Sequence, residues 1–514
     1  MAKGEPRLTL HTLGDVKDLD DPAKVQQFWE GILHGHISQI GLEQPRLKPL
    51  ISVVTHATNL KCVSVVVQTA VQDPDFAAEF HAYYGRIFQD VPRQCKRLHC
   101  FSKRWRRKGD VLRFVDAAGD LDYLGFITLR PVKANPVGAT ILRPPKDGSH
   151  FLLSKDTFDV HLAGKTFKVE GTPFLQQDNA VGACAQAAIW MALRTLRKRE
   201  GAAAHDLAQI TSSATRFFLN GRTLPNREGL VIQQMMEAVR SAGYSATLLS
   251  FREPGGRPRT ALLPKIKTSL YPYIESGIPV ILAMHTQQLG GHAVVLIGHG
   301  WHQQPLFCAL TAIVRGNQHI YVRNSADWAS PFFMHNDNTG PYLQIPDTGD
   351  KGSYTLDKVC YAIPLLPGDV YMTAEEAEQV AFRLISHAAG DELLDNKKYV
   401  FRTYLQERYK FREEAKASGM TTALKRQYRL MRLPRRLWVT EVNLQDAYEQ
   451  SDAGKGQRVG EVLVDPTGDP AQAPFLSIHL PDVLINRDPN TGKIEATRVA
   501  DDKPYSPLVR KPAS

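Results

Sequence analysis

A cysteine, a histidine and two asparagines stand in an order suited to covalent catalysis. Cys184 lies where the polar loop sequence QQDNAVGA gives way to CAQAAIWMALRTL, an alanine-rich run that predicts a helix. The N-terminus of a helix favours thiolate, because its aligned peptide dipoles stabilise negative charge. A lone cysteine is more often a small core residue, so the residues that accompany it decide the interpretation.

The candidate base is His292, which follows two glycines and begins the apolar run HAVVLIG. This run predicts a strand that carries its histidine at the entrance. An imidazole in that position can accept the proton of a thiol and later protonate the leaving group. A strand-end histidine with only a structural hydrogen bond is the alternative.

A third group is needed to hold the imidazole in one tautomer. Asn336 ends the strand-like segment PFFMHN, and Asn324 ends IYVRN. We prefer Asn336, because a Gly-Pro turn and a new strand follow at once. Asp337 beside it and Asn324 remain alternatives.

Two glutamines in the loop before the cysteine are candidates for an oxyanion hole. The amide of Gln177, with Gln176 in reserve, would join the backbone N–H of Cys184 in binding the developing negative charge. Loop glutamines are usually only solvated, so this assignment depends on the cysteine.

The segments QQDNAVGACAQAAIW and GGHAVVLIGHGW, with the asparagine-ended strands, resemble the papain-like clan of cysteine peptidases. The domain resembles most the bacterial members, such as those that cleave double-glycine leader peptides. The resemblance covers roughly 180 to 200 residues and implies a helix carrying the cysteine and an antiparallel sheet carrying the histidine and asparagine. Two departures are a glutamine seven residues before the cysteine, where the clan commonly has six, and Ala185 in place of tryptophan.

Composition indicates a folded protein from a reducing compartment. The chain has 514 residues, enough for several domains, and only six cysteines, which argues against a disulfide framework. No apolar run approaches the roughly 18 residues of a membrane helix, and we expect no secretory signal at the N-terminus. We expect a cytoplasmic protein, from a bacterium, that makes no membrane contact.

The order of the predicted elements indicates three regions and an α+β fold. Residues 1–165 form a mixed α/β region, in which residues 50–57 and 111–117 are predicted strands. Residues 166–365 have helices first and a mostly antiparallel sheet second, and form the papain-like domain that the resemblance implies. Residues 366–514 contain helices, a basic stretch and more strands, and the chain from about Asn490 is predicted to be frayed.

The formal net charge of +10 comes from one segment. Residues 397–436 contain thirteen Lys or Arg and three Glu, and we expect an exposed, largely helical surface there. A solvated helical face is the simpler interpretation. The alternative is a docking surface for nucleic acid or an acidic protein, formed by Lys425, Arg426, Arg429 and Arg432.

No cofactor or metal is expected. Cys95, His99 and Cys100 in CKRLHC lack a second pair at zinc-finger spacing. The sequence also contains no Walker loop, no dinucleotide-binding glycine motif and no HExxH.

The leading hypothesis is a cysteine peptidase or isopeptidase. The same three residues would also serve acyl transfer, as in transglutaminase-like and deamidating enzymes, because the acceptor depends on the shape of the cleft. A second class is a binding protein whose protease domain is degenerate or regulatory. A protease switched on by nucleic acid or protein in a defence or toxin system combines the two. The sequence does not determine the oligomeric state.

Overall fold

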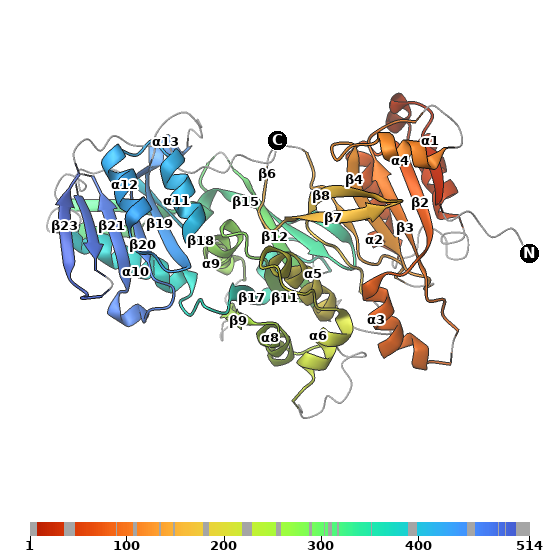
Figure 1. Ribbon diagram of the computed structural model, residues 1–514. Helices are drawn as coiled ribbons and strands as arrows, with labels where there is room; N and C mark the ends of the chain where they lie inside the picture. The colour runs from red at the N-terminus through yellow and green to blue at the C-terminus, as the bar shows by residue number, and fades with distance from the viewer. Residues whose placement is uncertain are drawn as a thin grey trace, which may run out of the picture.

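The computed structural model describes residues 8–34, 47–88, 90–105, 110–132, 135–146, 150–177, 184–217, 229–252, 259–286, 290–302, 304–306, 311–315, 318–350, 352–388, 398–449, 458–481, 483–488 and 490–499. Over these residues the chain forms three sheets and a separate hairpin, with helices between and around them (Figure 1). Pairing is antiparallel among the described strands except between β14 and β18. The fold is α+β, as predicted.

A mixed arrangement of five strands and several helices makes up the N-terminal part. The strands are β1 (Leu8–Thr12), β2 (Ser64–Val71), β3 (Cys95–Phe101), β4 (Tyr123–Leu129) and β5 (Ile141–Leu142), paired in that order. The helices are α1 (Pro22–Leu33), α2 (Lys48–Asn59), α3 (Pro74–Ala82) and α4 (Val111–Ala117). A hairpin of β7 (Asp156–Leu162) and β8 (Lys165–Gly171) follows.

Two strand predictions in this part are wrong. Residues 50–57 lie in α2, which begins with a proline in its first turn and buries Leu50, Val53 and Ala57 at helical spacing. Residues 111–117 form α4, whose first turn is capped by the Asp110 carboxylate. In both segments the start signal of a helix and its burial against the core outweigh the strand preference of β-branched residues.

The central sheet carries the candidate catalytic residues. Its order is β10 (Leu249–Ser250), β17 (Val359–Pro367), β11 (Val280–Thr286), β12 (Gly290–Trp301), β15 (Ala329–Asn336) and β16 (Gly340–Ile345). Two short strands, β6 (His150–Leu152) and β9 (Tyr244–Ala246), pair with β12 and β17.

Both faces of the central sheet are buried, which explains the unbroken apolar run after His292. Val295 of β12 packs in one core cluster with α5 and the N-terminal part. Its neighbours Val294 and Leu296 point the other way, into a second cluster with α9 (Leu263–Glu275), α10 (Ala374–Ala388) and the third sheet. A strand covered on both faces has no polar alternation.

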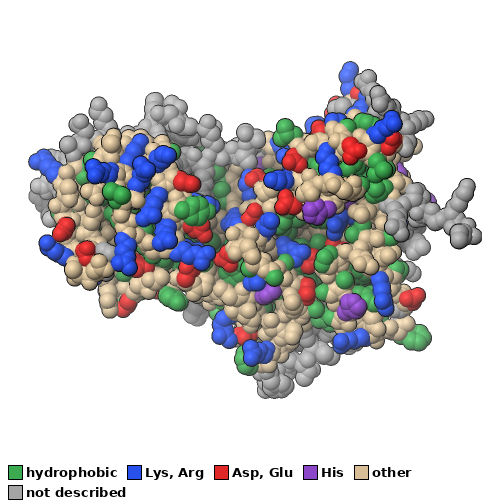
Figure 2. All heavy atoms as spheres, in the orientation of Figure 1, with side chains coloured by type: hydrophobic (Ala, Val, Ile, Leu, Met, Phe, Trp, Pro, Cys, Tyr) green, Lys and Arg blue, Asp and Glu red, His purple; other side chains and the backbone are tan. Residues whose placement is uncertain are grey.

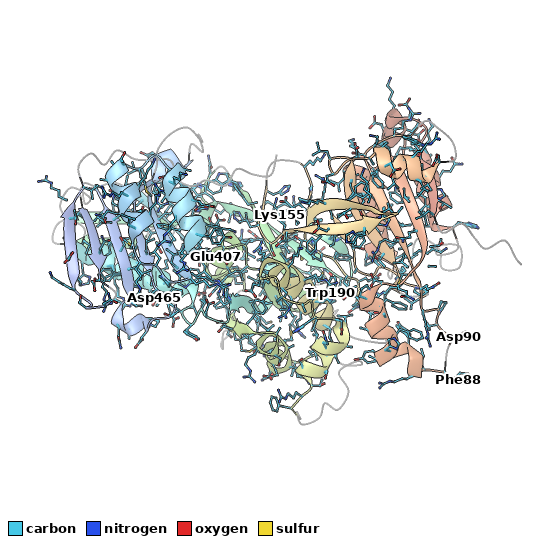
Figure 3. All side chains as sticks on the ribbon, in the orientation of Figure 1. Phe88, Asp90, Lys155, Trp190, Glu407 and Asp465 are labelled. Carbon is cyan, nitrogen blue, oxygen red and sulfur yellow. The ribbon has the colours of Figure 1, made fainter. Side chains whose placement is uncertain are left out.

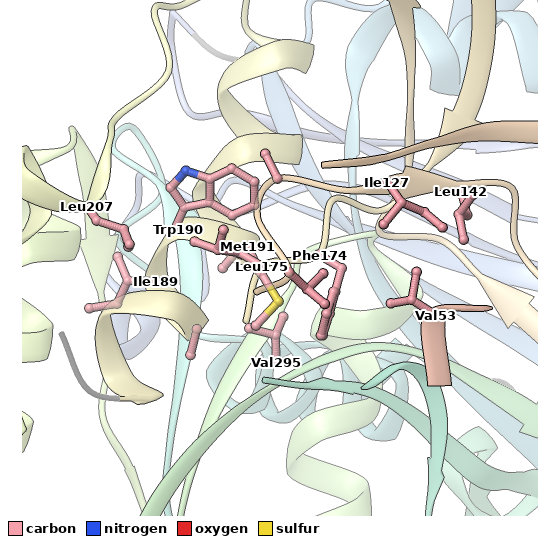
Figure 4. Close-up of a cluster of buried hydrophobic side chains, with 14 of the residues drawn as sticks. Val53, Ile127, Leu142, Phe174, Leu175, Ile189, Trp190, Met191, Leu207 and Val295 are labelled. Carbon is pink, nitrogen blue, oxygen red and sulfur yellow. The ribbon is translucent and has the colours of Figure 1, made fainter. Parts of the chain in front are cut away.

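Helix α5 (Cys184–Arg199) lies on the first of these faces (Figures 1 and 4). Trp190 and Met191 lie near Leu175 and Val295 in the cluster of Figure 4. On the side toward α3, the indole of Trp190 donates to Asp75 at 2.9 Å (Figure 3). The helix is therefore fixed from two directions, by the sheet and by the N-terminal part.

Helices α6 (Leu207–Ala214) and α8 (Ile232–Ser241) pack beside α5. Both belong to the helices that the sequence predicts ahead of the sheet in residues 166–365.

The third sheet collects strands from two of the predicted regions. Its order is β13 (Thr311–Arg315), β14 (Gln318–Asn324), β18 (Lys398–Glu407), β19 (Arg436–Leu444), β20 (Arg458–Val464), β21 (Phe475–Leu480), β22 (Val483–Arg487) and β23 (Ile494–Arg498). Because β13 and β14 lie within 166–365, and β6 lies within 1–165, strands cross both predicted boundaries. The division into three domains stays a prediction.

The basic segment is not largely helical. It begins with β18, an inner strand that buries Tyr399, Phe401 and Tyr404, and only then forms α11 (Arg408–Ala417) and α12 (Thr422–Leu430). These aromatic side chains pack into core clusters from a strand. They therefore do not form the apolar stripe of a surface helix. Part of the chain predicted to fray is also a strand, since β23 pairs with β22.

Replacing Gly340 by alanine should destabilise the fold. Its φ is +143°, and an added Cβ would lie 1.9 Å from the Ser52 Oγ and 2.4 Å from the Ser52 Cβ on α2. Strain and overpacking together should lower the free energy of unfolding by about 3 kcal/mol, measured by urea denaturation. Gly31→Ala is the matched control, because its added Cβ would meet nothing within 4 Å beyond the adjoining residues and backbone of its own helix. Equal stability of Gly340→Ala and the wild type would contradict the close approach of α2 and β16.

Candidate active site

Cys184 is the first residue of α5 and lies against β12. The backbone N–H of Ala293 donates to its sulfur at 3.4 Å. Since Ala293 follows His292 directly, this contact joins the helix that carries the thiol to the strand that carries the imidazole. The side chain of Cys184 is half-buried.

The His292 ring is held from β15. Its Nε2 lies 3.0 Å from Oδ1 of Asn336, and the histidine side chain is almost fully buried. An amide oxygen only accepts hydrogen bonds, so Nε2 carries the proton and donates it. Nδ1 is then the atom with the free electron pair, as a general base requires.

A tight turn fixes Asn336 in place. Its Oδ1 also accepts the N–H of Asn338 at 3.0 Å, and its carbonyl accepts the N–H of Thr339 at 3.0 Å. The amide oxygen therefore receives two donors and has little freedom to turn away from the histidine.

Asn324, the alternative third member, is not brought to His292. It ends β14 in the third sheet, where its Nδ2 donates to Glu378 at 2.8 Å and its Oδ1 accepts the N–H of Ala326. It lines a cavity with Glu375 and Phe382 on α10, apart from the cysteine.

Asp337 lies beside the imidazole and is completely buried. One of its oxygens is 3.6 Å from Nε2 of His292, and neither has a hydrogen-bond partner among the described residues. Burial raises the pKa of this carboxyl to about 8. The Asp337 carboxyl is therefore a weaker acid than usual, and it lies beside the same ring nitrogen, Nε2, that Asn336 holds.

The two glutamines have separate environments. Gln177 reaches the site, where its Nε2 donates to Oδ1 of Asn338 at 2.7 Å. Gln176 points elsewhere: its Oε1 accepts the N–H of Val137 at 3.1 Å and its Nε2 lies 3.3 Å from Asn135 Oδ1. Gln177 is therefore the better placed of the two, while residues 178–183 between it and Cys184 lie outside the described residues.

Burial keeps the thiol and the imidazole neutral in this arrangement. It raises the pKa of Cys184 to about 12, with a further contribution from the negative charge of Asp337. The N–H groups of Ala293, Ala185 and Cys184 itself lower that pKa, but by less. Burial also lowers the pKa of His292 to about 4. Desolvation therefore opposes the stabilisation of a thiolate that the sequence predicts at the helix terminus.

Two residues of the site had not been predicted. The Tyr354 ring lies over the His292 ring, with centroids 4.3 Å apart and planes at 32°. Burial, and then the charges of Cys184 and Asp337, raise the pKa of this phenol to about 12. Asn338 is the other, in contact with Gln177 and the imidazole. Only Asn338 had a sequence signal, as a polar turn residue directly after the asparagine-ended strand.

The residues predicted as a docking surface lie on and after α12. Arg426, Arg429 and Arg432 are exposed and Lys425 is half-buried. Figure 2 shows lysine and arginine side chains gathered on this side of the molecule.

The Cys95, His99 and Cys100 cluster lies on β3. His99 is buried between Tyr123, whose hydroxyl is 2.9 Å from Nδ1, and Gln68. Within the described ranges, no group of three or more His, Cys, Asp or Glu side chains is arranged to hold a metal ion. No helix in those ranges has the length and apolar character needed to cross a membrane.

Comparison with protein-family models and with curated proteins finds no match to this chain.

Asp337→Asn should make stability less dependent on pH. The folded-state pKa of about 8 lies above the ordinary value of 3.8, so the folded protein binds this proton more tightly than the unfolded chain. Stability conferred by the protonated carboxyl is complete below pH 4 and is lost as pH rises toward 8. The Asp337→Asn side chain stays neutral. The free energy of unfolding of the variant should therefore rise relative to that of the wild type by at most about 1.4 kcal/mol per pH unit across this window.

Urea denaturation at pH 4.5, 6 and 8 measures the difference. Asp350→Asn, which removes an exposed carboxyl, is the matched control. A constant gap between Asp337→Asn and the wild type at all three pH values would contradict a protonated, buried Asp337.

Proposed function

We propose that this protein is a papain-like cysteine hydrolase that cleaves an amide bond in a protein or peptide. The observation that carries the proposal is the connection between Cys184, His292 and Asn336. One backbone N–H joins the thiol to the histidine strand, and Asn336 holds Nε2 of the imidazole at 3.0 Å. Three separate chain segments meet there in the order nucleophile, base and orienting residue.

The proposed reaction uses these positions in two stages. Nδ1 of His292 takes the proton of the Cys184 thiol as the sulfur attacks the substrate carbonyl carbon. The carbonyl electron pair moves to oxygen, where the Gln177 amide and the N–H of Cys184 stabilise it. The imidazolium then protonates the leaving amine, and water, deprotonated by His292, releases the acyl group from the sulfur.

A cytoplasmic location belongs to the same proposal. Five cysteines of the described residues, including Cys184, are free thiols. This is the state expected in a reducing compartment.

Substituting the three residues should separate their roles. Cys184→Ala and His292→Ala should each reduce turnover by at least ~10³-fold, whereas Asn336→Ala should reduce it by about 10- to 100-fold, because an orienting group transfers no proton. Asn324→Ala is the matched control and should keep wild-type turnover. Cleavage of a fluorogenic peptide library, and labelling of Cys184 by a peptidyl epoxide, are the measurements.

Three product assays in ¹⁸O-labelled water distinguish whether water or an amine accepts the acyl group, and whether the amide cleaved is a peptide bond or a glutamine side chain. Incorporation of ¹⁸O into a new peptide carboxyl indicates a peptidase, and release of ammonia from glutamine indicates deamidation. A crosslink to an added amine indicates acyl transfer. Turnover that persists in Cys184→Ala would exclude all three.

The exposed cations of α11 and α12 favour a second role, the docking of a polyanion. Besides Arg426 and Arg429 on α12 and Arg432 just after it, Lys410 and Lys416 are exposed on α11. The two helices pack on a small core cluster that includes Phe411 and Tyr428, and this packing holds the cations on one surface. Regularly exposed cations of this kind attract phosphates through counterion release. Such docking would let nucleic acid or an acidic protein recruit or trigger the hydrolase, as in a defence system.

A charge-reversal variant should not bind single-stranded or duplex nucleic acid at about 50 mM salt, where such contacts are strong. This variant has glutamate in place of Lys425, Arg426, Arg429 and Arg432. Labelling of Cys184 should be unchanged. Reversal of Arg86, Arg113, Lys168 and Lys493, which are exposed elsewhere, is the matched control. If the wild type binds no polyanion, nucleic acid or acidic polypeptide, in fluorescence anisotropy at this salt concentration, the docking role is excluded.

A further inference from the structure

The Asn338 side chain lies between the candidate oxyanion donor and the candidate base. Its Oδ1 accepts a hydrogen bond from Gln177 at 2.7 Å, and its Nδ2 is 3.5 Å from Nδ1 of His292. Its own backbone N–H donates to Asn336 at 3.0 Å, which fixes the residue in the turn after β15. One side chain therefore contacts the two groups that a substrate would need.

The direction of these bonds follows from the tautomer. Nε2 of His292 donates to Asn336, so Nδ1 has the electron pair and the amide of Asn338 donates to it. Nδ1 is the atom that must take the thiol proton. The sulfur of Cys184, in turn, accepts the N–H of Ala293. The base, Nδ1 of His292, is thus hydrogen-bonded to the Asn338 amide, and the nucleophile, the Cys184 sulfur, to the backbone N–H of Ala293.

The oxyanion donor is engaged in the same way. The Nε2 group of Gln177 points to Asn338, with a bond length typical of a good hydrogen bond. Of the two N–H groups of this amide, the one that points to Asn338 is the one for which a substrate carbonyl oxygen would compete. The neutral forms of the thiol and the imidazole agree with a resting arrangement, since burial raises the pKa of Cys184 and lowers that of His292.

We propose that Asn338 is a self-inhibitory latch, which holds both the base and the oxyanion donor until a substrate carbonyl takes the amide of Gln177. This inference rests on the proposed hydrolase function and adds its regulation. Loss of the Gln177 bond frees Asn338 to turn away from Nδ1. The thiol proton then passes to Nδ1, the sulfur–carbon bond forms, and the carbonyl electron pair moves to the oxygen held by Gln177.

The test measures thiol reactivity and needs no peptidase turnover. The second-order rate of iodoacetamide alkylation at Cys184 is measured at pH 7, with the adduct mapped by mass spectrometry. Asn338→Ala removes the latch, and Gln177→Ala removes its anchor without touching the turn. Asn338→Ala loses the hydrogen bond to the base, and Gln177→Ala loses the hydrogen bond that anchors Asn338. Each change removes about one neutral hydrogen bond, so both should raise the rate on the order of three- to tenfold.

Two controls separate the latch from general loosening. Asn324→Ala removes an asparagine of the third sheet and should leave the rate unchanged. Adding His292→Ala to Asn338→Ala should remove the gain, because the faster reaction requires the base. Gln177→Ala keeps the test decisive if Asn338→Ala fails to fold.

The outcomes are distinct. Faster, His292-dependent alkylation in Gln177→Ala supports the latch, even if no peptide is cleaved and the proposed hydrolase function fails. An unchanged or slower rate in Gln177→Ala overturns the latch, even if the wild type cleaves peptides. A gain that survives His292→Ala also overturns it, because loosened packing would then explain the reactivity.

Discussion

The packing of α5 on β12 is the contact on which the rest of the site depends. The helix is apolar on nearly every side, and small residues such as Ala185 and Ala188 let it approach the sheet closely. The sulfur of Cys184 then meets the backbone of β12 at Ala293. A rotation of the helix by one residue would turn the thiol about 100° away from the strand, since an α-helix has 3.6 residues per turn.

A chain of buried ionisable side chains joins the central sheet to the third sheet. It runs from β12 through α9 to β18, β19, β20 and β21, and consists of His299, Glu275, Arg402, Glu441, Arg458, Glu461 and His479. Each acidic member contacts at least one basic side chain, and the two arginines are almost fully buried. Breaking one such pair leaves an uncompensated buried charge, at a cost of about 3 to 5 kcal/mol. The strand that carries His292 is therefore tied to the C-terminal part of the chain by charge as well as by apolar packing.

The sequence predicted the elements of the site better than their surroundings. The runs after Cys184 and His292 have a local signal, since one is alanine-rich and the other continuously apolar, and both segments formed as predicted. The choice of Asn336 over Asn324 rested on the turn that follows it, and the hydrogen bonds of that turn hold the amide toward His292. Tyr354 had no signal, because its position over the imidazole depends on where the chain returns after β16. Arg402 was predicted to be exposed, because it lies in a basic stretch. It is buried, because it pairs with Glu275 and Glu441, which are distant in sequence.

Burial sets the central problem of the site, because proton transfer from the thiol to the imidazole creates two charges where the neutral forms are favoured. Attraction between the two charges recovers part of this cost, because opposite charges interact more strongly at a low effective dielectric constant than in water. The N–H groups of Cys184 and Ala293 stabilise the thiolate, while Asn336 and Asp337 face Nε2 of the imidazolium. A carboxyl whose pKa is about 8 is sensitive to that change, since a positive charge 3.6 Å away favours its ionised form. Formation of the imidazolium would thus tend to draw the proton off Asp337, and the carboxylate would stabilise the imidazolium in return. Asn336 and Asp337 therefore suit different states of the same ring, the amide oxygen holding neutral histidine and the carboxylate holding the charged form.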